Sequence, residues 1–310
     1  MNIYIHLIFS LLLIFPSFGN TQTIKKISGK ILDAEIKKPI QYVTVEIEGK
    51  NKGALTNKTG FFTFNIDETF NKDSLSIRII GYQPKKIAVK EFLKNNKAGH
   101  LNNPIYIEPL TYTLPEVVFS SDKECEKVLS GVNTKSNSAL IWGVGYQFSV
   151  YCQNKQSLKN GVISKVRFYL KNEGKPKTPF RIHIYSVNLI DTTPGIELLH
   201  ENLIVSADKA KWFEVDVEKY NIPLPKEGIF VSMEWIYTDE KYYYISEPHR
   251  KKHSSQQYGQ VLGAIEGSKL DNYTYFKKLG GKWNKFIYPP LYEEGKTYNA
   301  LIGAEITYCP

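Results

Sequence analysis

Residues Ile27 to Tyr82 read ISGKILDAEIKKPIQYVTVEIEGKNKGALTNKTGFFTFNIDETFNKDSLSIRIIGY, and this stretch decides the fold of the chain. Within it, apolar and polar side chains alternate along residues 43–48, 62–66 and 74–79. A period of two is the pattern of a β-strand that buries one face. Glycine, proline and asparagine separate the three runs and favour tight turns. Short strands at this spacing predict an antiparallel β-sandwich.

The order of the turn-forming and small residues carries a more specific signal. It runs Gly29, Asp33, Pro39-Ile40, Gly49, Gly53, Thr56-Asn57, Gly60-x-Phe62, Gly81-Tyr82, Ile105-Tyr106-Ile107, Pro109 and Leu114-x-Glu116-Val117-Val118. This order resembles the carboxypeptidase-like regulatory domain, a family abundant in surface and periplasmic proteins of Bacteroidota that often precedes outer-membrane receptors. The resemblance covers residues 24–119 and implies a transthyretin-like, seven-stranded Greek-key sandwich without an active site of its own. The polar stretch 90–103 is longer than the usual link in such domains, and a short helix is expected near residues 91–93.

Length and charge narrow the class of protein. The chain has 310 residues, enough for two domains, and a formal net charge of +9. Its Lys and Arg residues are scattered rather than clustered on one element, which argues against a nucleic-acid-binding protein. The charge is therefore interpreted as a lysine-rich, soluble surface.

The N-terminal residues predict export. An apolar run at residues 3–15 is followed by Pro-Ser-Phe-Gly at 16–19, which predicts a secretory signal peptide at residues 1–19, although no Lys or Arg precedes the run. The run is short for a membrane span, and no later stretch is long or apolar enough to cross a bilayer as a helix. We therefore expect an exported protein that is periplasmic, outer-membrane-associated or secreted, and not membrane-spanning.

The second half of the chain also predicts strands. Polar residues 120–138 are interpreted as a linker with a short helix over 122–129, and strands resume at Ala139. The expected strands are 142–152, 165–171, 180–187, 198–205, 213–218, 228–237, 242–246, 274–276 and 300–308. No long segment keeps a helical period, so residues 139–310 predict a jelly-roll-like β-sandwich and the whole chain an all-β fold. The run Leu203 to Trp235 is similar to accessory sandwiches of secreted Bacteroidota proteins, some of which bind carbohydrate.

Three cysteines allow one disulfide in an exported protein. Cys152 ends an early predicted strand of the second domain, and Cys309 ends its last one. Because the first and last strands of a sandwich often lie close together, we expect a Cys152–Cys309 bond, although connectivity is not fixed by sequence. Cys125 falls in the predicted linker and has no His or Asp nearby that would make it a nucleophile.

Aromatic residues are the candidate binding residues, because their faces stack on sugar rings and anchor protein interfaces. The candidates are Trp283, Tyr273, Tyr275 and Trp212. Alternation assigns many aromatic residues of the second domain to the core, Trp235 among them, and for the whole set a structural role is favoured. Trp283 follows Gly280-Gly281-Lys282, a loop-like setting, and is therefore the best surface candidate.

Candidates for catalysis and metal binding are few. Glu234 lies between Met233 and Trp235 in an apolar strand, and a buried carboxylate there would have a raised pKa suited to a general acid. No partner for it is visible, and His183 is expected to point outward. His249 and His253 flank three cationic residues, which argues against a metal site. The sequence predicts no catalytic residue, no metal and no cofactor.

Together these patterns predict an exported, non-catalytic, two-domain β protein of the cell envelope that binds a glycan or an envelope protein. The alternatives are a glycan-active hydrolase that uses Glu234 and a purely structural component. A sugar-binding surface would show two or three coplanar exposed aromatic rings. A hydrolase would hold two carboxylates about 5–10 Å apart in a cleft, and a structural protein would show neither.

Overall fold

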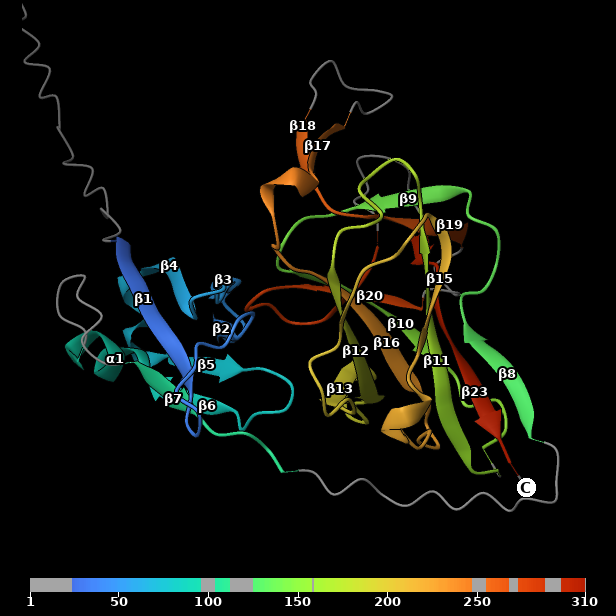
Figure 1. Cartoon of the computed structure of the whole chain (residues 1–310), viewed down its shortest axis with the longest axis horizontal. Helices are drawn as coiled ribbons and strands as arrows, with labels where there is room; N and C mark the ends of the chain where they lie inside the picture. Colours follow the sequence, from blue (N-terminus) through green and yellow to red (C-terminus); the bar gives the residue numbers. More distant parts are fainter. Residues whose placement is uncertain are drawn as a thin grey trace, which may run out of the picture.

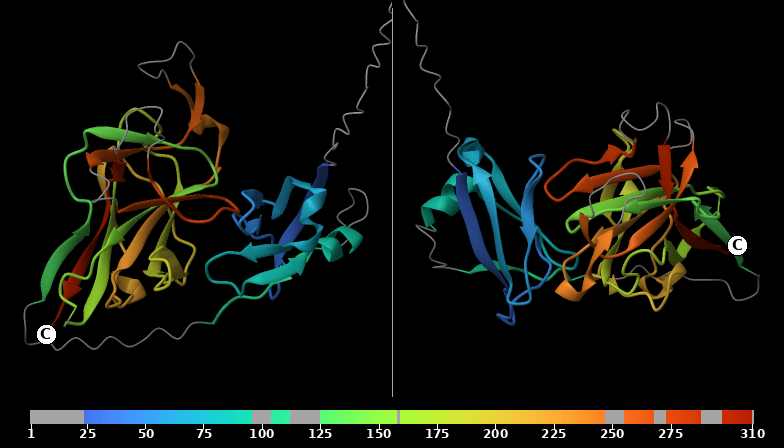
Figure 2. Two further views of the ribbon diagram at one scale, coloured as in Figure 1. Left: turned by 180° about the vertical axis from the view of Figure 1, so that it is seen from behind. Right: turned by 90° about the horizontal axis from the view of Figure 1, so that it is seen from above.

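Two β domains lie side by side in the computed structural model (Figures 1 and 2). The structure describes residues 24–95, 104–111, 125–157, 159–246, 255–267, 273–287 and 297–309. The expected signal peptide, the motif at 114–118, His249 and His253 lie outside these residues. In the described part of the chain, no helix has the length and apolar character needed to span a membrane.

The first domain is a sandwich of two sheets, as the period of two predicts. One sheet has the order β4-β1-β7, formed by β4 (Phe61–Asp67), β1 (Ile24–Asp33) and β7 (Ile105–Ile107). The other has the order β3-β2-β5-β6, formed by β3 (Lys52–Leu55), β2 (Thr44–Ile47), β5 (Ser74–Arg78) and β6 (Lys85–Ala88). Two helices complete the domain, η1 (Glu68–Lys72) and α1 (Val89–Asn95), the latter covering the short helix expected near 91–93. Ile31, Val45 and Ile77 are fully buried between the sheets.

Hydrogen bonds and close contacts explain why the signature residues of this domain occupy their positions. One carboxylate oxygen of Asp33 accepts the two backbone N–H groups of residues 35 and 36, and the other accepts the Tyr82 hydroxyl at 2.8 Å. This bond ties the turn after β1 to the turn after β5. Gly60 has φ +73°, and a Cβ there would lie 2.4 Å from the Ile31 carbonyl oxygen, so any side chain would clash.

The second domain is a larger sandwich. Its first sheet has the order β13-β12-β16-β10-β20-β21, with β14 beside β12. These strands are β13 (Pro194–Glu197), β12 (Phe180–Val187), β16 (Ile229–Trp235), β10 (Tyr146–Cys152), β20 (Thr274–Lys278), β21 (Asn284–Lys285) and β14 (Ile204–Val205). The predicted all-β class is therefore confirmed, while the jelly-roll designation stays a prediction.

The second sheet of this domain covers one face of the first. Its order is β22-β19-β11-β23-β8, with β15 beside β11 and β9 beside β19. The strands are β22 (Thr297–Ala300), β19 (Val261–Gly267), β11 (Gly161–Leu170), β23 (Ile302–Tyr308), β8 (Glu126–Gly131), β15 (Lys211–Asp216) and β9 (Ser138–Ile141). A hairpin of β17 (Tyr243–Ser246) and β18 (Ser255–Tyr258) projects from the sandwich, and η3 (Glu218–Tyr220) and η4 (Glu240–Tyr242) are single helical turns (Figure 1). Phe148, Phe168 and Trp235 are buried between the sheets.

The segment predicted as a linker contributes a strand to the second domain. β8 pairs with β23 in antiparallel register, so the helix expected over 122–129 was wrong over the described residues 126–129. Of the strand expected over 198–205, only the last two residues form a strand, β14, and β13 ends just before this region. β8 is an edge strand with mostly exposed side chains, which explains why it lacks a clear apolar alternation.

The disulfide joins Cys125 to Cys309, and the expected Cys152–Cys309 bond was wrong. Tyr308 pairs with Glu126 across β23 and β8, which places Cys309 opposite Cys125 just outside the ladder. Cys152 is a free thiol that faces the core between the two sheets, and burial raises its pKa to about 12. It is therefore an inert core residue.

Replacing Cys125 and Cys309 together by Ser should lower the free energy of unfolding by about 2–4 kcal/mol, because the bond closes a long loop in the unfolded chain. Urea unfolding of the unreduced wild type and of the double variant measures this difference.

Thiol titration in denaturant without reductant tests the pairing itself. The wild type should expose one thiol per chain, that of Cys152, and a Cys152→Ala variant should expose none. A Cys152→Ala variant that still exposes a thiol would contradict the assignment.

Candidate functional site

The first sheet of the second domain carries a row of polar side chains on the face turned away from its core. Antiparallel register aligns Arg181 on β12 with Glu234 on β16, Glu234 with Gln147 on β10, and Gln147 with Lys277 on β20. Neighbouring residues on each strand point the opposite way and fill the core between the sheets. A polar row across four strands is unusual for a face that is buried, and here it faces the first domain.

Aromatic residues lie beside this polar row on the same face. Tyr185 is two residues beyond His183 on β12, and the two rings stack with centroids 5.3 Å apart and an interplanar angle of 10°. Trp283 and Tyr185 make an edge-to-face contact at a centroid distance of 5.8 Å. The Tyr185 hydroxyl donates a hydrogen bond to Gln147 Oε1 at 3.1 Å, which fixes the orientation of that amide.

Glu234 is a fully buried carboxylate held by two cations. Its Oε2 lies 3.3 Å from Arg181 Nη1 and 3.0 Å from His183 Nε2. The other ring nitrogen of His183 lies 2.6 Å from Glu197 Oε2. His183, which was expected to point outward, is 5% exposed, so this expectation was wrong. The second face of the sheet is covered rather than solvated.

The pKa values in this cluster follow from burial and charge together. Burial alone would raise the pKa of Glu234, but Arg181 and His183 outweigh it and lower this pKa to about 2. Burial would lower the pKa of His183, but Glu197 and Glu234 outweigh it and raise the value. The expected raised pKa of Glu234 was therefore wrong, and this carboxylate stays ionised instead of serving as a proton donor.

In the first domain, the outer face of the β3-β2-β5-β6 sheet lies opposite this polar row. Thr44 pairs with Arg78 across β2 and β5, and the Arg78 guanidinium forms an ion pair with Glu46. Glu48 lies 3.8 Å from Arg78 Nη1 and 3.1 Å from Lys86 Nζ. Thr44, Glu46 and Glu48 are the polar positions of the alternation that identifies β2 in the sequence.

Direct contacts dock the two domains. The buried Arg181 guanidinium donates to the Tyr42 carbonyl oxygen at 2.5 Å, and the Gly280 N–H donates to Glu46 Oε2 at 2.7 Å. The Asn51 N–H donates to the Gly280 carbonyl oxygen at 3.1 Å. Gly280 has φ +74°, and a Cβ there would lie 2.4 Å from the Lys52 carbonyl oxygen, so this close approach requires glycine.

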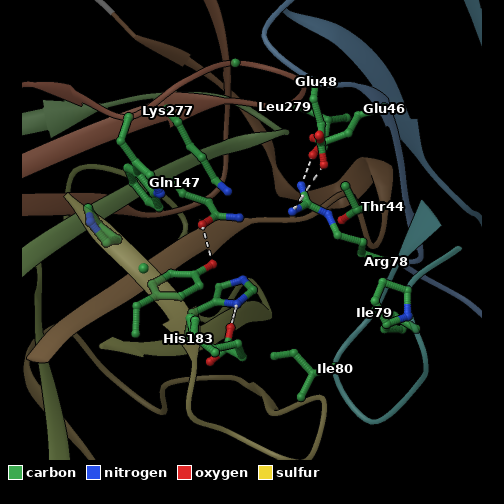
Figure 3. A pocket seen from close by; sticks show the side chains of 18 of the residues that line it. Thr44, Glu46, Glu48, Arg78, Ile79, Ile80, Gln147, His183, Lys277 and Leu279 are labelled. Atoms are coloured by element: carbon green, nitrogen blue, oxygen red, sulfur yellow. Dashed lines mark hydrogen bonds and ion pairs between the residues drawn. The ribbon is translucent and has the colours of Figure 1, made fainter. Parts of the chain in front are cut away.

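A cleft of about 910 Å³ remains open between the two polar walls. Figure 3 shows Glu46, Glu48 and Arg78 entering it from the first domain, opposite Gln147 and Lys277 of the second. Trp283 forms part of the lining beside Lys277. The cleft therefore offers hydrogen-bond donors, acceptors, charges of both signs and an aromatic side chain along one continuous lining.

The structure separates the four aromatic candidates. Trp283 lines the cleft, whereas Tyr275 is 6% exposed and packs beneath it with Phe230. Tyr273 is 43% exposed but is not part of the cleft lining. Trp212 lies on the other sheet, where it packs against Tyr169 and the Arg167 guanidinium. These residues do not form the coplanar platform expected for a sugar-binding surface.

The sequence interpretation missed the site residues of the first domain and, in the second domain, Gln147, Arg181 and Lys277. Charged residues at alternating positions on otherwise buried strands, such as Arg181 and His183 on β12 and Glu234 on β16, were the available signal that a second face is covered. Across the described residues, no three His, Cys, Asp or Glu side chains gather in a way that could hold a metal ion.

Comparison with known proteins identifies the first domain. Residues 27–118 match the family model described as the CarboxypepD_reg-like domain. The match supports the module inferred from the signature of glycines and aromatic residues, and the seven described strands β1 to β7 form its sandwich. A search of curated proteins found no match to this chain.

Replacing Arg181 by Met should destabilise the protein by about 3–5 kcal/mol, because the variant leaves the buried Glu234 charge and the Tyr42 carbonyl without this donor. Lys159→Met is the control, since its ion pair with Glu126 is exposed on both sides and should contribute less than about 1 kcal/mol. Urea unfolding measures both. The Arg181→Met/Glu234→Gln variant should recover part of the loss, and equal losses for the two single variants would contradict the buried role of Arg181.

The stability of the protein should depend on pH at both ends of the range. The raised pKa of His183 means that the folded state binds its proton more tightly, so this contribution is complete below pH 6.5 and is lost as pH rises through the folded value. The lowered pKa of Glu234 makes its contribution complete above pH 4.5 and lost as pH falls towards 2.

Urea unfolding as a function of pH checks this dependence. Glu197→Gln should reduce the loss of stability that occurs as pH rises above 6.5, because Glu197 raises the pKa of His183. Glu218→Gln on the exposed η3 should leave this loss unchanged. If Glu197→Gln loses as much stability with rising pH as the wild type, His183 is not the group responsible for that loss.

Proposed function

We propose that this protein is an exported, non-catalytic binding protein of the cell envelope that holds a glycan in the cleft between its two domains. The observation that carries the proposal is the open cleft of about 910 Å³, which combines the aromatic side chain of Trp283 and the amide of Gln147 with charged groups from both domains. The expected platform of coplanar rings is not formed, but a cleft can bind a sugar with one aromatic side chain, because the sugar ring packs on that side chain while its hydroxyl groups exchange hydrogen bonds with polar groups on both walls.

The rigidity of the cleft supports a binding role. Both walls are sheet faces whose side chains are aligned by strand register, and the Arg181–Tyr42 and Gly280–Glu46 hydrogen bonds hold the walls together. A site that is formed before its ligand arrives loses less conformational entropy on binding. A cleft built on two sheets is therefore well suited to a ligand of defined shape.

The state of the carboxylates supports a non-catalytic role. A hydrolase of the retaining or inverting type needs a carboxylic acid that gives up its proton near neutral pH. Glu234 is ionised, with a pKa of about 2, and Glu197 accepts hydrogen bonds from the Ile184 N–H at 3.0 Å and from His183. These two carboxylates hold the sheet face in place.

Glycan-array binding by the exported form of the chain, with both domains present, tests the proposal. Trp283→Ala should weaken binding about tenfold, which corresponds to about 1.4 kcal/mol of lost contact. Trp212→Ala is the matched control, because this residue is also a partly exposed aromatic but lies on the other sheet.

Two outcomes would overturn the glycan proposal. One is the absence of binding to any glycan, and the other is an equal loss in the two tryptophan variants. Thermal unfolding of each variant separates a lost contact from a lost fold. The second domain is not tested alone, because Arg181 and Gly280 bond to the first domain.

A further inference from the structure

The acidic and basic side chains that line the cleft differ in whether they have a partner within the protein. Each acidic side chain that contributes to the lining has a donor in hydrogen-bond or ion-pair contact. The pairs are Glu46 with Arg78 and the Gly280 N–H, Glu48 with Lys86, Asp191 with Thr193, and Glu197 with His183. The negative charges of the cleft are therefore already bound within the protein.

Two cations in the lining have no such partner. Among the described residues, neither Lys277 nor Lys282 forms an ion pair with a carboxylate. The Lys277 ammonium lies 4.8 Å from the centroid of the Trp283 ring and 6.0 Å from that of Tyr185. Aromatic faces attract a cation but do not neutralise it. A partly buried ammonium group thus faces the cleft without a bound counter-charge.

The environment of Lys277 leaves room for an anion. Burial lowers the pKa of Lys277, and the positive charge of Arg78 on the opposite wall lowers it further, although Glu46, Glu234 and Glu197 act in the other direction. Figure 3 shows Lys277 and Gln147 on one wall facing Arg78 on the other. An anion placed between these groups would relieve the repulsion between two cations that come from different domains.

The neighbours of Lys277 define what kind of anion fits. Gln147 uses its carbonyl oxygen to accept from Tyr185, which leaves its amide N–H groups as donors beside the ammonium. Lys277 supplies a point charge and the amide supplies directed donors, a combination that suits a carboxylate. Trp283 lines the same cleft beside Lys277 and provides an apolar surface for a sugar ring.

We infer that the cleft binds an acidic sugar, and that Lys277 and Gln147 receive the carboxylate of a uronic-acid or sialic-acid residue whose ring packs against Trp283. This inference rests on the proposed glycan-binding function and specifies the ligand class. A neutral sugar of the same shape leaves the Lys277 charge without an ionic partner and binds more weakly.

Calorimetric titration of the two-domain chain with matched ligands tests the inference. The ligands are the acidic glycans that bind on the array and the same glycans after reduction of their carboxyl groups to alcohols. The wild type should bind each acidic form at least about tenfold more tightly, equivalent to one ion pair in a partly buried site. Lys277→Met should remove this preference, and Lys277→Arg should restore most of it.

Controls separate this inference from the function on which it rests. Lys209→Met removes an exposed lysine outside the cleft lining and should leave the preference intact. Equal affinity of the wild type for acidic and reduced glycans would overturn the acidic-sugar inference and leave glycan binding standing. Failure to bind either form would overturn both. A preference that survives in Lys277→Met would show that another residue receives the carboxylate.

Discussion

The buried carboxylate of Glu234 is the constraint on which the arrangement of the two domains depends. An isolated charge in a sheet interior costs several kcal/mol, so it requires cations and hydrogen bonds around it. Arg181 and His183 provide the cations, and His183 in turn requires Glu197. Arg181 then reaches the Tyr42 carbonyl of the first domain. One buried charge thus links three strands of the second domain to the neighbouring domain.

Most of the fold could be predicted from the sequence because period-two alternation records one buried face. β12 spans Phe180–Val187, as the pattern predicts, and the runs around Val45 and Phe62 form β2 and β4. β8 could not be predicted in this way, because an edge strand with exposed side chains needs few apolar residues. The error in β8 led directly to the error in the disulfide, since Cys125 is placed by the register of β8 against β23.

The candidate site was less accessible to sequence analysis because it forms between domains. Trp283 could be found from its glycine-rich loop, but Arg78 and Lys277 meet only after two separate sheets have docked. Polar residues at alternating positions are normally solvent-facing, and a single such residue does not distinguish a solvated face from one that another domain covers. The signal lies in combinations such as Arg181 and His183 on a central strand, where the number of charges exceeds what such a strand usually carries.

The place of β23 in its sheet has a consequence for the order of folding. β23 lies between β11 and β8, so the second sheet cannot close until residues 302–308 are in place. The described strands of the first domain end at Ile107, so that domain can assemble without any strand from the second half of the chain. A chain that folds from its N-terminal end therefore passes through a state with a finished first domain and a second sheet in which β11 and β8 each lack a neighbouring strand.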